Sequence, residues 1–309
     1  MSLKGKKVLV TGGAGFIGSH TVDALVREGA NVVVVDNLSS GRRENINPEA
    51  AFYEVNIADP EIEIIMEKER PGIICHFAYF VFVPKSVQNP LLDMDCLAGT
   101  LRILGKAKDL NVKKVLYSSS GFVYGNNPNL PLKEKEPFSY DTPYAISKEA
   151  TENYLRFFSK TYGLPYVVLR YATVYGPGQA TGAMADYIRK LSSGQQADIW
   201  GDGTKTRDYV FIADVVRANL LALTVRSDNP DPVFNISSGV ETTLNTLYKK
   251  TSDLLGRKAM PVYHKDRPGE QIRFCLNNSK AKKELGWRPE FSLDEGLKIT
   301  VEAAAKGNG

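Results

Sequence analysis

Short runs of apolar residues alternate along the first half of the chain with longer segments in which apolar residues recur every three to four positions. The first two runs are Val8 to Val10 and Val32 to Val35, and between them residues 16–28 carry apolar side chains at Ile17, Val22, Leu25 and Val26. A short uninterrupted apolar run is typical of a buried parallel strand, and the wider spacing is typical of a helix that packs on it. The pattern therefore predicts strand, helix and strand in succession.

The same alternation continues to about residue 175. Further strands are expected after helical segments, at residues 51–55, 73–77, 114–118 and 165–170. Strands that alternate with helices favour right-handed crossovers and a parallel sheet with helices on both faces. The predicted fold class is thus α/β, a Rossmann-type doubly wound parallel sheet.

Glycine and proline interrupt the pattern after Tyr175, at Gly176, Pro177, Gly178 and Gly182. Helices are expected beyond this point at residues 183–191, 214–224, 244–255, 279–285 and 293–304, and strands at 208–213 and 234–236. We therefore predict two domains. Residues 1–175, with a returning segment near 207–236, are predicted to form the first domain, and residues 176–309 most of a smaller C-terminal α/β lobe.

A cluster of glycines follows the first predicted strand directly. Gly12, Gly13, Gly15 and Gly18 allow the backbone to turn sharply and to approach a diphosphate closely, at the start of a helix whose free N–H groups bind anions. The order of strand, glycine loop, helix and second strand is the order that a dinucleotide-binding unit requires. The sequence therefore predicts a dinucleotide site here.

The residue at the end of the second strand selects between cofactors. Asp36 follows Val35, where a carboxylate can accept hydrogen bonds from the adenosine ribose hydroxyls. Arg42 and Arg43 could instead face a 2′-phosphate, but Asp36 would repel that group. NAD is therefore favoured over NADP. We expect residues 1–175 to be the NAD-binding domain and the lobe of residues 176–309 to bind the substrate.

Composition and charge exclude several other classes of protein. The 309 residues are 43% hydrophobic and 24% charged, with a net charge of +4, which is ordinary for a globular enzyme and forms no basic stripe for nucleic acid. The three cysteines and three histidines are scattered, which indicates neither a disulfide framework nor a metal site. Because no apolar run is long enough to span a bilayer, we expect a cytoplasmic protein without a membrane partner.

Candidate chemistry lies at the start of a predicted helix. Tyr144 and Lys148 are four residues apart and so share one helical face, next to Pro143. A nearby ammonium group and the positive nicotinamide both favour the phenolate of a tyrosine, whose ordinary pKa is about 10. The strand at 114–118 leads into Ser118, Ser119 and Ser120, where a hydroxyl can share the substrate's proton with Tyr144. A structural surface pair of Tyr and Lys is the alternative interpretation.

With these features the chain resembles the extended short-chain dehydrogenase/reductase family, and more narrowly its UDP-glucose (UDP-galactose) 4-epimerase branch. The matching segments cover nearly the whole chain: residues 11–20, 36–41, 118–125, 144–148, 170–171, 174–177, 207–212, 267–269 and 284–287. The resemblance implies an NAD-dependent isomerase that acts on a nucleotide sugar.

The resemblance also implies roles for individual residues. Tyr144 is the general base, Lys148 binds the nicotinamide ribose and lowers the tyrosine's pKa, and Ser120 is the hydroxyl partner. The positions that match cofactor contacts are Gly12, Gly15, Phe16, Ile17, Gly18, Asp36, Asn37, Ser39, Ser40, Gly41, Asn56, Ile57, Phe77, Ala78, Lys85, Tyr144, Lys148 and Tyr171. Those that match substrate contacts are Ser120, Tyr144, Thr173, Arg207, Arg267 and Phe274.

The same resemblance bears on the sugar. Dehydratases and decarboxylases of the family carry acids where this chain has Gly121 and Phe122, so epimerisation through a transient 4-keto sugar is favoured. The large side chain of Phe274 favours glucose and galactose over N-acetylated sugars. Thr173 and Lys85 suit a uronic acid, so UDP-glucuronate 4-epimerase is the alternative. A non-catalytic protein that binds NAD and a sugar nucleotide is the other alternative.

Two departures from the family pattern fall near the expected nicotinamide. Tyr79 stands where relatives usually carry Ala or Gly, and Cys96 stands where they commonly carry asparagine. Elsewhere, Asn56 stands where an aspartate often contacts adenine. The resemblance further implies a homodimer whose contact is a four-helix arrangement of residues 93–108 and 149–161.

Overall fold

The structure is a computed structural model that describes residues 2–80, 83–224, 229–266 and 271–307. The chain forms two compact units. The first comprises residues up to 123 together with 137–170 and 216–234, and the second comprises 124–136, 171–215 and 235 onward. The assignment of cofactor binding to the first unit and of substrate binding to the second stays a prediction.

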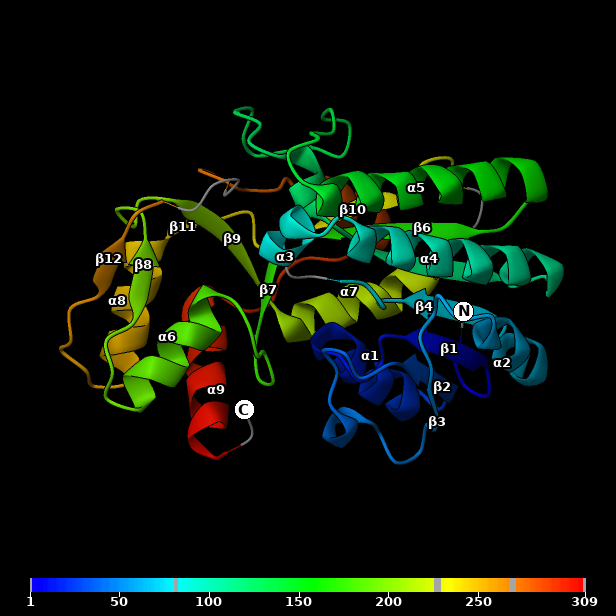
Figure 1. Ribbon diagram of the computed structural model, residues 1–309, viewed down its shortest axis with the longest axis horizontal. Helices are drawn as coiled ribbons and strands as arrows, with labels where there is room; N and C mark the ends of the chain where they lie inside the picture. Colours follow the sequence, from blue (N-terminus) through cyan, green and yellow to red (C-terminus); the bar gives the residue numbers. More distant parts are fainter. Residues whose placement is uncertain (1, 81–82, 225–228, 267–270, 308–309) are drawn as a thin grey trace. The chain divides into compact units, whose positions relative to one another are not determined.

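A seven-stranded sheet is the centre of the first unit (Figure 1). Its strand order is β10-β6-β5-β4-β1-β2-β3, and the registers from β3 through β2, β1 and β4 to β5 are parallel. The strands are β1 (Lys7–Thr11), β2 (Asn31–Asp36), β3 (Ala51–Glu54), β4 (Ile73–His76), β5 (Lys114–Ser120), β6 (Tyr166–Tyr171) and β10 (Val233–Ile236). The predicted Rossmann-type α/β class is confirmed.

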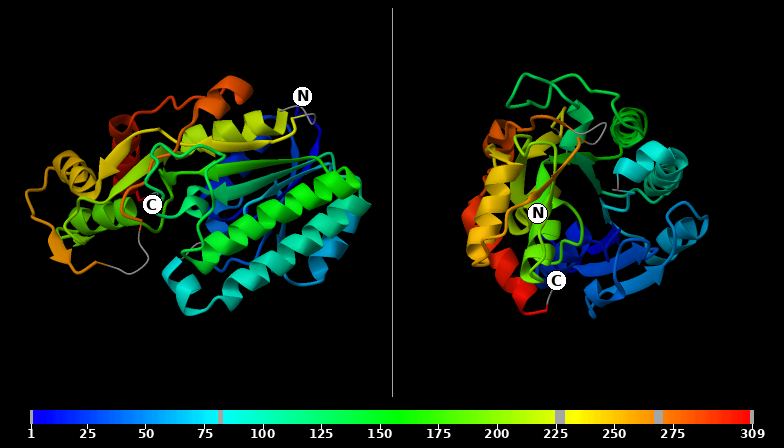
Figure 2. Two further views of the ribbon diagram at one scale, coloured as in Figure 1. Left: turned by 90° about the horizontal axis from the view of Figure 1, so that it is seen from above. Right: turned by 60° about the vertical axis from the view of Figure 1, so that its left-hand side comes forward.

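Helices cover both faces of this sheet. Figures 1 and 2 show α4 and α5 side by side over one face, with α1 and α7 over the other. The helices of the unit are α1 (Phe16–Arg27), α2 (Glu61–Glu69), α3 (Val83–Gln88), α4 (Leu91–Asp109), α5 (Pro143–Tyr162) and, from residue 216 on, α7 (Ile212–Thr224). Side chains such as Leu9, Ile74, Ile103 and Leu155 are fully buried in the layer under α2, α4 and α5. Burial of one such side chain stabilises the fold by about 1.5–3 kcal/mol.

The second unit contains two small sheets and three packed helices. β7 (Thr173–Tyr175), β9 (Thr206–Phe211) and β11 (Glu241–Thr243) form one sheet, and β8 (Asp198–Trp200) and β12 (Val262–His264) form the other. The helices α6 (Ala183–Ser192), α8 (Leu244–Leu254) and α9 (Leu293–Ala305) pack against one another. Trp287 is fully buried there, and its indole N–H donates to the Asp214 carbonyl at 2.8 Å.

Among the predicted boundaries that differ from the structure, the one between β9 and α7 has a clear physical reason. The strand expected at residues 208–213 is β9, which begins at Thr206 and ends at Phe211, and Ile212 and Ala213 already belong to α7. The reason lies in the neighbouring strand, because Phe211 pairs with Tyr175, the last residue of β7. Beyond that pair β7 offers no further backbone partner, so the chain turns into a helix.

Candidate functional site

The glycine loop follows β1 and forms the start of α1, as the sequence predicts. Gly12 has a φ of +71°, and a Cβ placed there would lie 2.6 Å from the backbone nitrogen of Ala78. A Cβ on Gly18 would lie 2.0 Å from the Gly12 carbonyl oxygen. Since a side chain would collide with backbone at both positions, only glycine allows this close packing of loop, helix and the end of β4.

Asp36 lies at the carboxyl end of β2, next to this loop. Its side chain is buried, with one oxygen accepting from the Ala14 N–H at 3.0 Å and the other from the Leu38 N–H at 2.8 Å. The guanidinium of Arg43 pairs with Glu54 and lies over the ring of Phe52. The loop and the carboxylate thus fit a dinucleotide with unmodified ribose hydroxyls, which is NAD.

The remaining residues predicted to contact the cofactor differ in burial and in the hydrogen bonds that they form. Asn37 caps its own loop by accepting from the Ser39 N–H at 3.1 Å, and Asn56 accepts from the Ala58 N–H at 3.1 Å. Ile57 is buried, and Lys85 is exposed on α3. Phe77 and Ala78 follow β4 directly, Ser40 and Gly41 precede Arg42, and Tyr171 is the buried last residue of β6.

The structure brings Ser120, Tyr144 and Lys148 together within the first unit. Ser120 is the last residue of β5, and α5 begins at Pro143, where the Thr142 hydroxyl caps the helix by accepting from the Ala145 N–H at 3.2 Å. All three side chains are less than 10% exposed. The Lys148 ammonium donates to the Ser118 carbonyl at 2.7 Å, which fixes the lysine against β5.

Burial dominates the electrostatics of the pair. It raises the pKa of Tyr144 to about 12, and a hydrogen bond with the Ser120 side chain opposes the rise. It also lowers the pKa of Lys148 to about 7, against the opposing influence of Cys96, Glu152 and Asp93. The spacing of Tyr144 to a lysine predicts a lowered tyrosine pKa, whereas the pKa in the structure is raised. The reason is that, without a bound cofactor, burial disfavours the charged phenolate. A cationic nicotinamide ring would favour the phenolate.

Three tyrosine rings surround Lys148. Its nitrogen lies 3.8 Å from the ring centroid of Tyr79, 4.8 Å from that of Tyr117 and 5.7 Å from that of Tyr144. The contact with Tyr79 was not predicted, although the sequence marks Tyr79 as a departure from its family. Cys96, the second departure, lies in the same neighbourhood, and its sulfur accepts from the Phe80 N–H at 3.3 Å.

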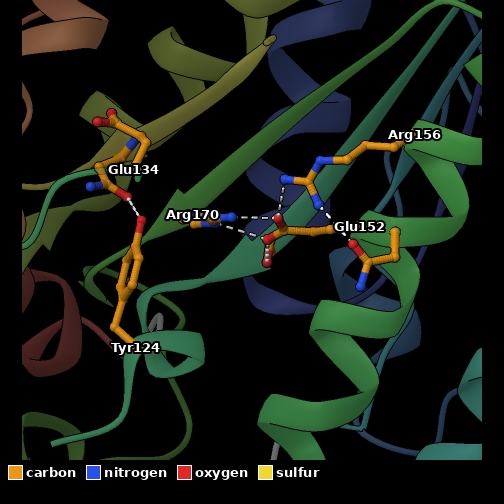
Figure 3. A network of polar contacts seen from close by, with 8 residues as sticks. Tyr124, Glu134, Glu152, Arg156 and Arg170 are labelled. Carbon is orange, nitrogen blue, oxygen red and sulfur yellow. Dashed lines mark hydrogen bonds and ion pairs between the residues drawn. The ribbon is translucent and has the colours of Figure 1, made fainter. Parts of the chain in front are cut away.

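Glu152, one turn after Lys148, forms an ion-pair network that holds α5 to the sheet (Figure 3). Arg170 of β6 donates to both carboxylate oxygens, at 2.9 and 2.6 Å, and the Ser119 hydroxyl donates at 2.6 Å. Arg156 approaches one oxygen at 3.4 Å from the outer side. Because Ser119 precedes Ser120, this network sets the register between the serine strand and the helix that carries Tyr144.

A second buried carboxylate, Asp93 of α4, joins three helices nearby. It accepts from the Ser86 hydroxyl of α3 at 2.6 Å and from the Ser147 hydroxyl of α5 at 3.3 Å. Sequence reasoning missed both Asp93 and the Glu152 network. A charged residue on the buried face of a predicted amphipathic helix is the signal that could have found them.

Besides Ser120 and Tyr144, the described residues predicted to contact the substrate belong to the second unit. Thr173 of β7 pairs with Tyr209 of β9. Arg207 lies two residues before Tyr209, and its guanidinium donates to the Gln271 carbonyl at 2.9 Å. Phe274 is fully buried, and its N–H donates to the Thr206 hydroxyl at 3.2 Å. Arg267 lies outside the described residues.

Metal and membrane features are absent from the described part of the chain. No group of three His, Cys, Asp or Glu side chains is placed to hold a metal ion among residues 2–80, 83–224, 229–266 and 271–307. Over the same residues, none of the helices has the length and apolar character that a bilayer crossing requires.

Comparison with known proteins identifies the family. The model of the NAD dependent epimerase/dehydratase family matches residues 8–237. A putative UDP-glucose 4-epimerase of Methanocaldococcus jannaschii is 38% identical over 307 residues, which cover 97% of this chain and 99% of the relative. The chain is therefore similar to this relative over nearly the full length of both.

Two solved structures also match over nearly their whole length. The UDP-glucose 4-epimerase of Thermotoga maritima with UDP-glucose is 45% identical with a TM-score of 0.94, covering 97% of this chain and 99% of that one. A UDP-N-acetylglucosamine 4-epimerase of Methanobrevibacter ruminantium is 35% identical with a TM-score of 0.92, covering 98% and 99%. The protein thus belongs to the NAD dependent epimerase/dehydratase family, as an NAD-dependent isomerase of the UDP-glucose 4-epimerase type.

Proposed function

We propose that this sugar-nucleotide 4-epimerase interconverts UDP-glucose and UDP-galactose. The observation that carries the proposal is the buried arrangement of Ser120, Tyr144 and Lys148 in the same unit as the glycine loop and Asp36. The 45% identity to an epimerase solved with UDP-glucose supports the choice of sugar.

In this proposal Tyr144 moves the proton of the sugar's 4-hydroxyl. The glycine loop, Asp36 and Lys148 would hold NAD, which would supply the redox chemistry, a reversible hydride transfer at sugar C4. The Tyr144 phenolate takes the hydroxyl proton as C4 becomes a carbonyl, and the Ser120 hydroxyl orients the same oxygen. After the 4-keto sugar has turned its other face, Tyr144 returns the proton, so the product is an isomer with no net oxidation. Lys148 holds the nicotinamide ribose and favours the phenolate by its charge.

The second unit is proposed to bind the nucleotide part of the substrate. Arg207 and Arg267 would hold the nucleotide and diphosphate, because a planar guanidinium matches phosphate oxygens in pairs. Phe274 is bulky and buried, which favours a sugar without an N-acetyl group. Thr173 supports the alternative, UDP-glucuronate, since the family resemblance associates threonine at this position with uronic acids.

Product analysis with four sugar nucleotides tests the function. UDP-glucose, UDP-galactose, UDP-N-acetylglucosamine and UDP-glucuronate are each incubated with the purified protein and NAD, and the products are separated by anion-exchange chromatography. We expect UDP-galactose and UDP-glucose to reach one common mixture from either side, with Tyr144→Phe as the matched inactive control. Faster conversion of UDP-glucuronate would establish the alternative sugar. No conversion of any of the four would reject the proposed substrate.

We also propose that two copies associate through α4 and α5. These helices pack against each other and carry large exposed apolar side chains, among them Leu91 (69% exposed), Met94 (55%) and Phe157 (47%). Exposed apolar residues on adjoining helices favour burial against a second copy. Sedimentation should give twice the chain mass, and Phe157→Glu should give the mass of a single chain.

The cytoplasm remains the expected compartment.

A further inference from the structure

Tyr79 contacts both members of the Tyr144 and Lys148 pair. It lies just beyond β4, and the Lys148 nitrogen is 3.8 Å from its ring centroid. Its ring also meets the Tyr144 ring edge to face, with centroids 5.9 Å apart and an interplanar angle of 82°. Tyr79 is therefore placed to stabilise the charge of Lys148 and to fix the orientation of the Tyr144 ring.

Lys148 has little else to stabilise its charge. Its hydrogen bond to the Ser118 carbonyl, at 2.7 Å, uses one of three N–H donors, and no carboxylate of the described residues forms an ion pair with it. The nearest carboxylates are engaged elsewhere, Glu152 with Arg170 and Ser119, and Asp93 with Ser86 and Ser147.

Every element packed around Lys148 contributes a titratable group. These groups are His76 of β4, Tyr79 after β4, Asp93 and Cys96 of α4, Tyr117 of β5, and Tyr144 and Glu152 of α5. His76 is buried between hydrogen bonds to Thr11 and Thr100, and burial lowers its pKa to about 3, so it carries no charge near neutral pH. Of the three rings around the ammonium, that of Tyr79 is the closest.

Burial without an ion pair disfavours the ammonium form, which is the main cause of the lowered pKa of Lys148. An aromatic face stabilises a cation by its quadrupole, most strongly where water is excluded. The face of Tyr79 therefore offsets part of the cost that burial imposes on the charge.

We propose that Tyr79 is a positioning residue of the epimerase reaction, whose ring face holds Lys148 as an ammonium against the Ser118 carbonyl and beside Tyr144. The inference rests on the proposed function, because the ammonium matters to catalysis through the proton that Tyr144 moves. It goes beyond the family pattern, in which this position usually carries Ala or Gly. The alternative is that Tyr79 only fills space.

Two substitutions separate these possibilities. Tyr79→Phe keeps the aromatic face and removes the hydroxyl, whereas Tyr79→Leu keeps an apolar side chain over the lysine and removes the aromatic face. In Tyr79→Leu the ammonium loses the nearest of its aromatic rings while an apolar side chain still covers it, so we expect Lys148 to lose its proton about one pH unit lower. Tyr79→Phe should titrate like the unsubstituted protein.

The direct measurement is the ¹³C NMR titration of the Lys148 ε-carbon in the NAD-loaded protein, assigned by the signal that disappears in Lys148→Met. The second measurement is the pH profile of kcat with UDP-galactose. The alkaline limb of this profile should move down by about one pH unit in Tyr79→Leu and stay in place in Tyr79→Phe.

Unchanged titration of Lys148 in Tyr79→Leu overturns the proposal, whatever happens to the rate. A fall in kcat that is equal at every pH, with Tyr79→Phe affected as strongly, also overturns it, because lost packing would have that effect. Since the NMR titration needs no turnover, it remains decisive if none of the four sugar nucleotides reacts, an outcome that would reject the proposed function alone.

Discussion

Two buried charges lie one turn apart on α5 and have opposite surroundings. Glu152 is fully buried and receives hydrogen bonds from Arg170, Ser119 and Arg156, so its charge is matched by partners. Lys148 is 2% exposed, and among the residues that the structure describes its contacts are the Ser118 carbonyl and the rings of three tyrosines. A buried charge whose hydrogen bonds and counter-charge all come from the protein stabilises the fold. A buried charge with few such partners is available to bind a ligand or to take part in a proton transfer. The following substitutions test this contrast.

The largest effect is expected from Lys148→Met, on activity alone. The substitution keeps an unbranched side chain of similar volume and removes the ammonium, so kcat should fall by about 10²–10⁴-fold. The free energy of unfolding should stay the same or rise, because an undersatisfied buried charge is replaced by an apolar group. Steady-state kinetics and urea unfolding measure the two quantities. A strongly destabilised variant would show that Lys148 is structural, like Glu152.

Glu152→Gln should have its main effect on the free energy of unfolding, in contrast to Lys148→Met. The amide keeps the shape of the carboxylate but leaves Arg170 buried without its counter-charge, which costs about 3–5 kcal/mol. Urea unfolding at a fixed protein concentration measures the loss, since the proposed dimer makes stability depend on concentration. The control is the double variant Glu152→Gln with Arg170→Met, which removes the orphaned charge and should recover part of the loss. Equal stability of single and double variants would contradict the ion-pair explanation.

The pH dependence of stability should also distinguish the two charges. The pKa of Lys148 is about 7 in the folded protein and about 10.5 when unfolded, so the unfolded chain binds the extra proton between these values. Unfolding free energy therefore rises with pH in this window through Lys148, by on the order of 3 kcal/mol between pH 7 and pH 9.5. This rise should be absent in Lys148→Met and retained in Arg156→Ala. Parallel curves for the unsubstituted protein and Lys148→Met would place the Lys148 pKa near its ordinary value.

The smallest effect is expected at the outer edge of the Glu152 network. Arg156 is 37% exposed and approaches Glu152 at 3.4 Å, while Arg170 already satisfies both oxygens. Arg156→Ala should therefore cost about 0.5 kcal/mol or less, and kcat should not change. Thermal unfolding by calorimetry is sensitive enough to resolve it. A loss as large as that of Glu152→Gln would mean that the outer arginine, too, belongs to the buried pair.

Much of the first unit could be predicted because its signals are local. The apolar runs of β1 and β2, the glycines between them and Asp36 lie within 30 residues, and each element's pattern is complete in itself. The pairing of Tyr144 with Lys148 follows from helical spacing alone. Ser120 could be added because parallel strands place their carboxyl ends at the same edge of a sheet.

The ring of Tyr79 and the partners of Glu152 could not be predicted in the same way. Tyr79 belongs to the segment after β4, Ser119 to β5 and Arg170 to β6, and each meets α5 only when that helix packs on the sheet. No spacing rule connects residues on different elements. The end of β9 is a comparable case, because the length of the partner strand β7 determines it.

By itself the sequence determined the order of strands and helices, the glycine loop with its carboxylate, and the phenol and amine on one helical face. Those features depend on steric preferences and periodicities that act between neighbours in the chain. Only the tertiary structure decided how strongly each buried charge is satisfied, and with it the pKa of Tyr144 and Lys148. The reason is physical, since solvent exclusion and the approach of distant dipoles and rings are properties of the packed protein and not of any segment.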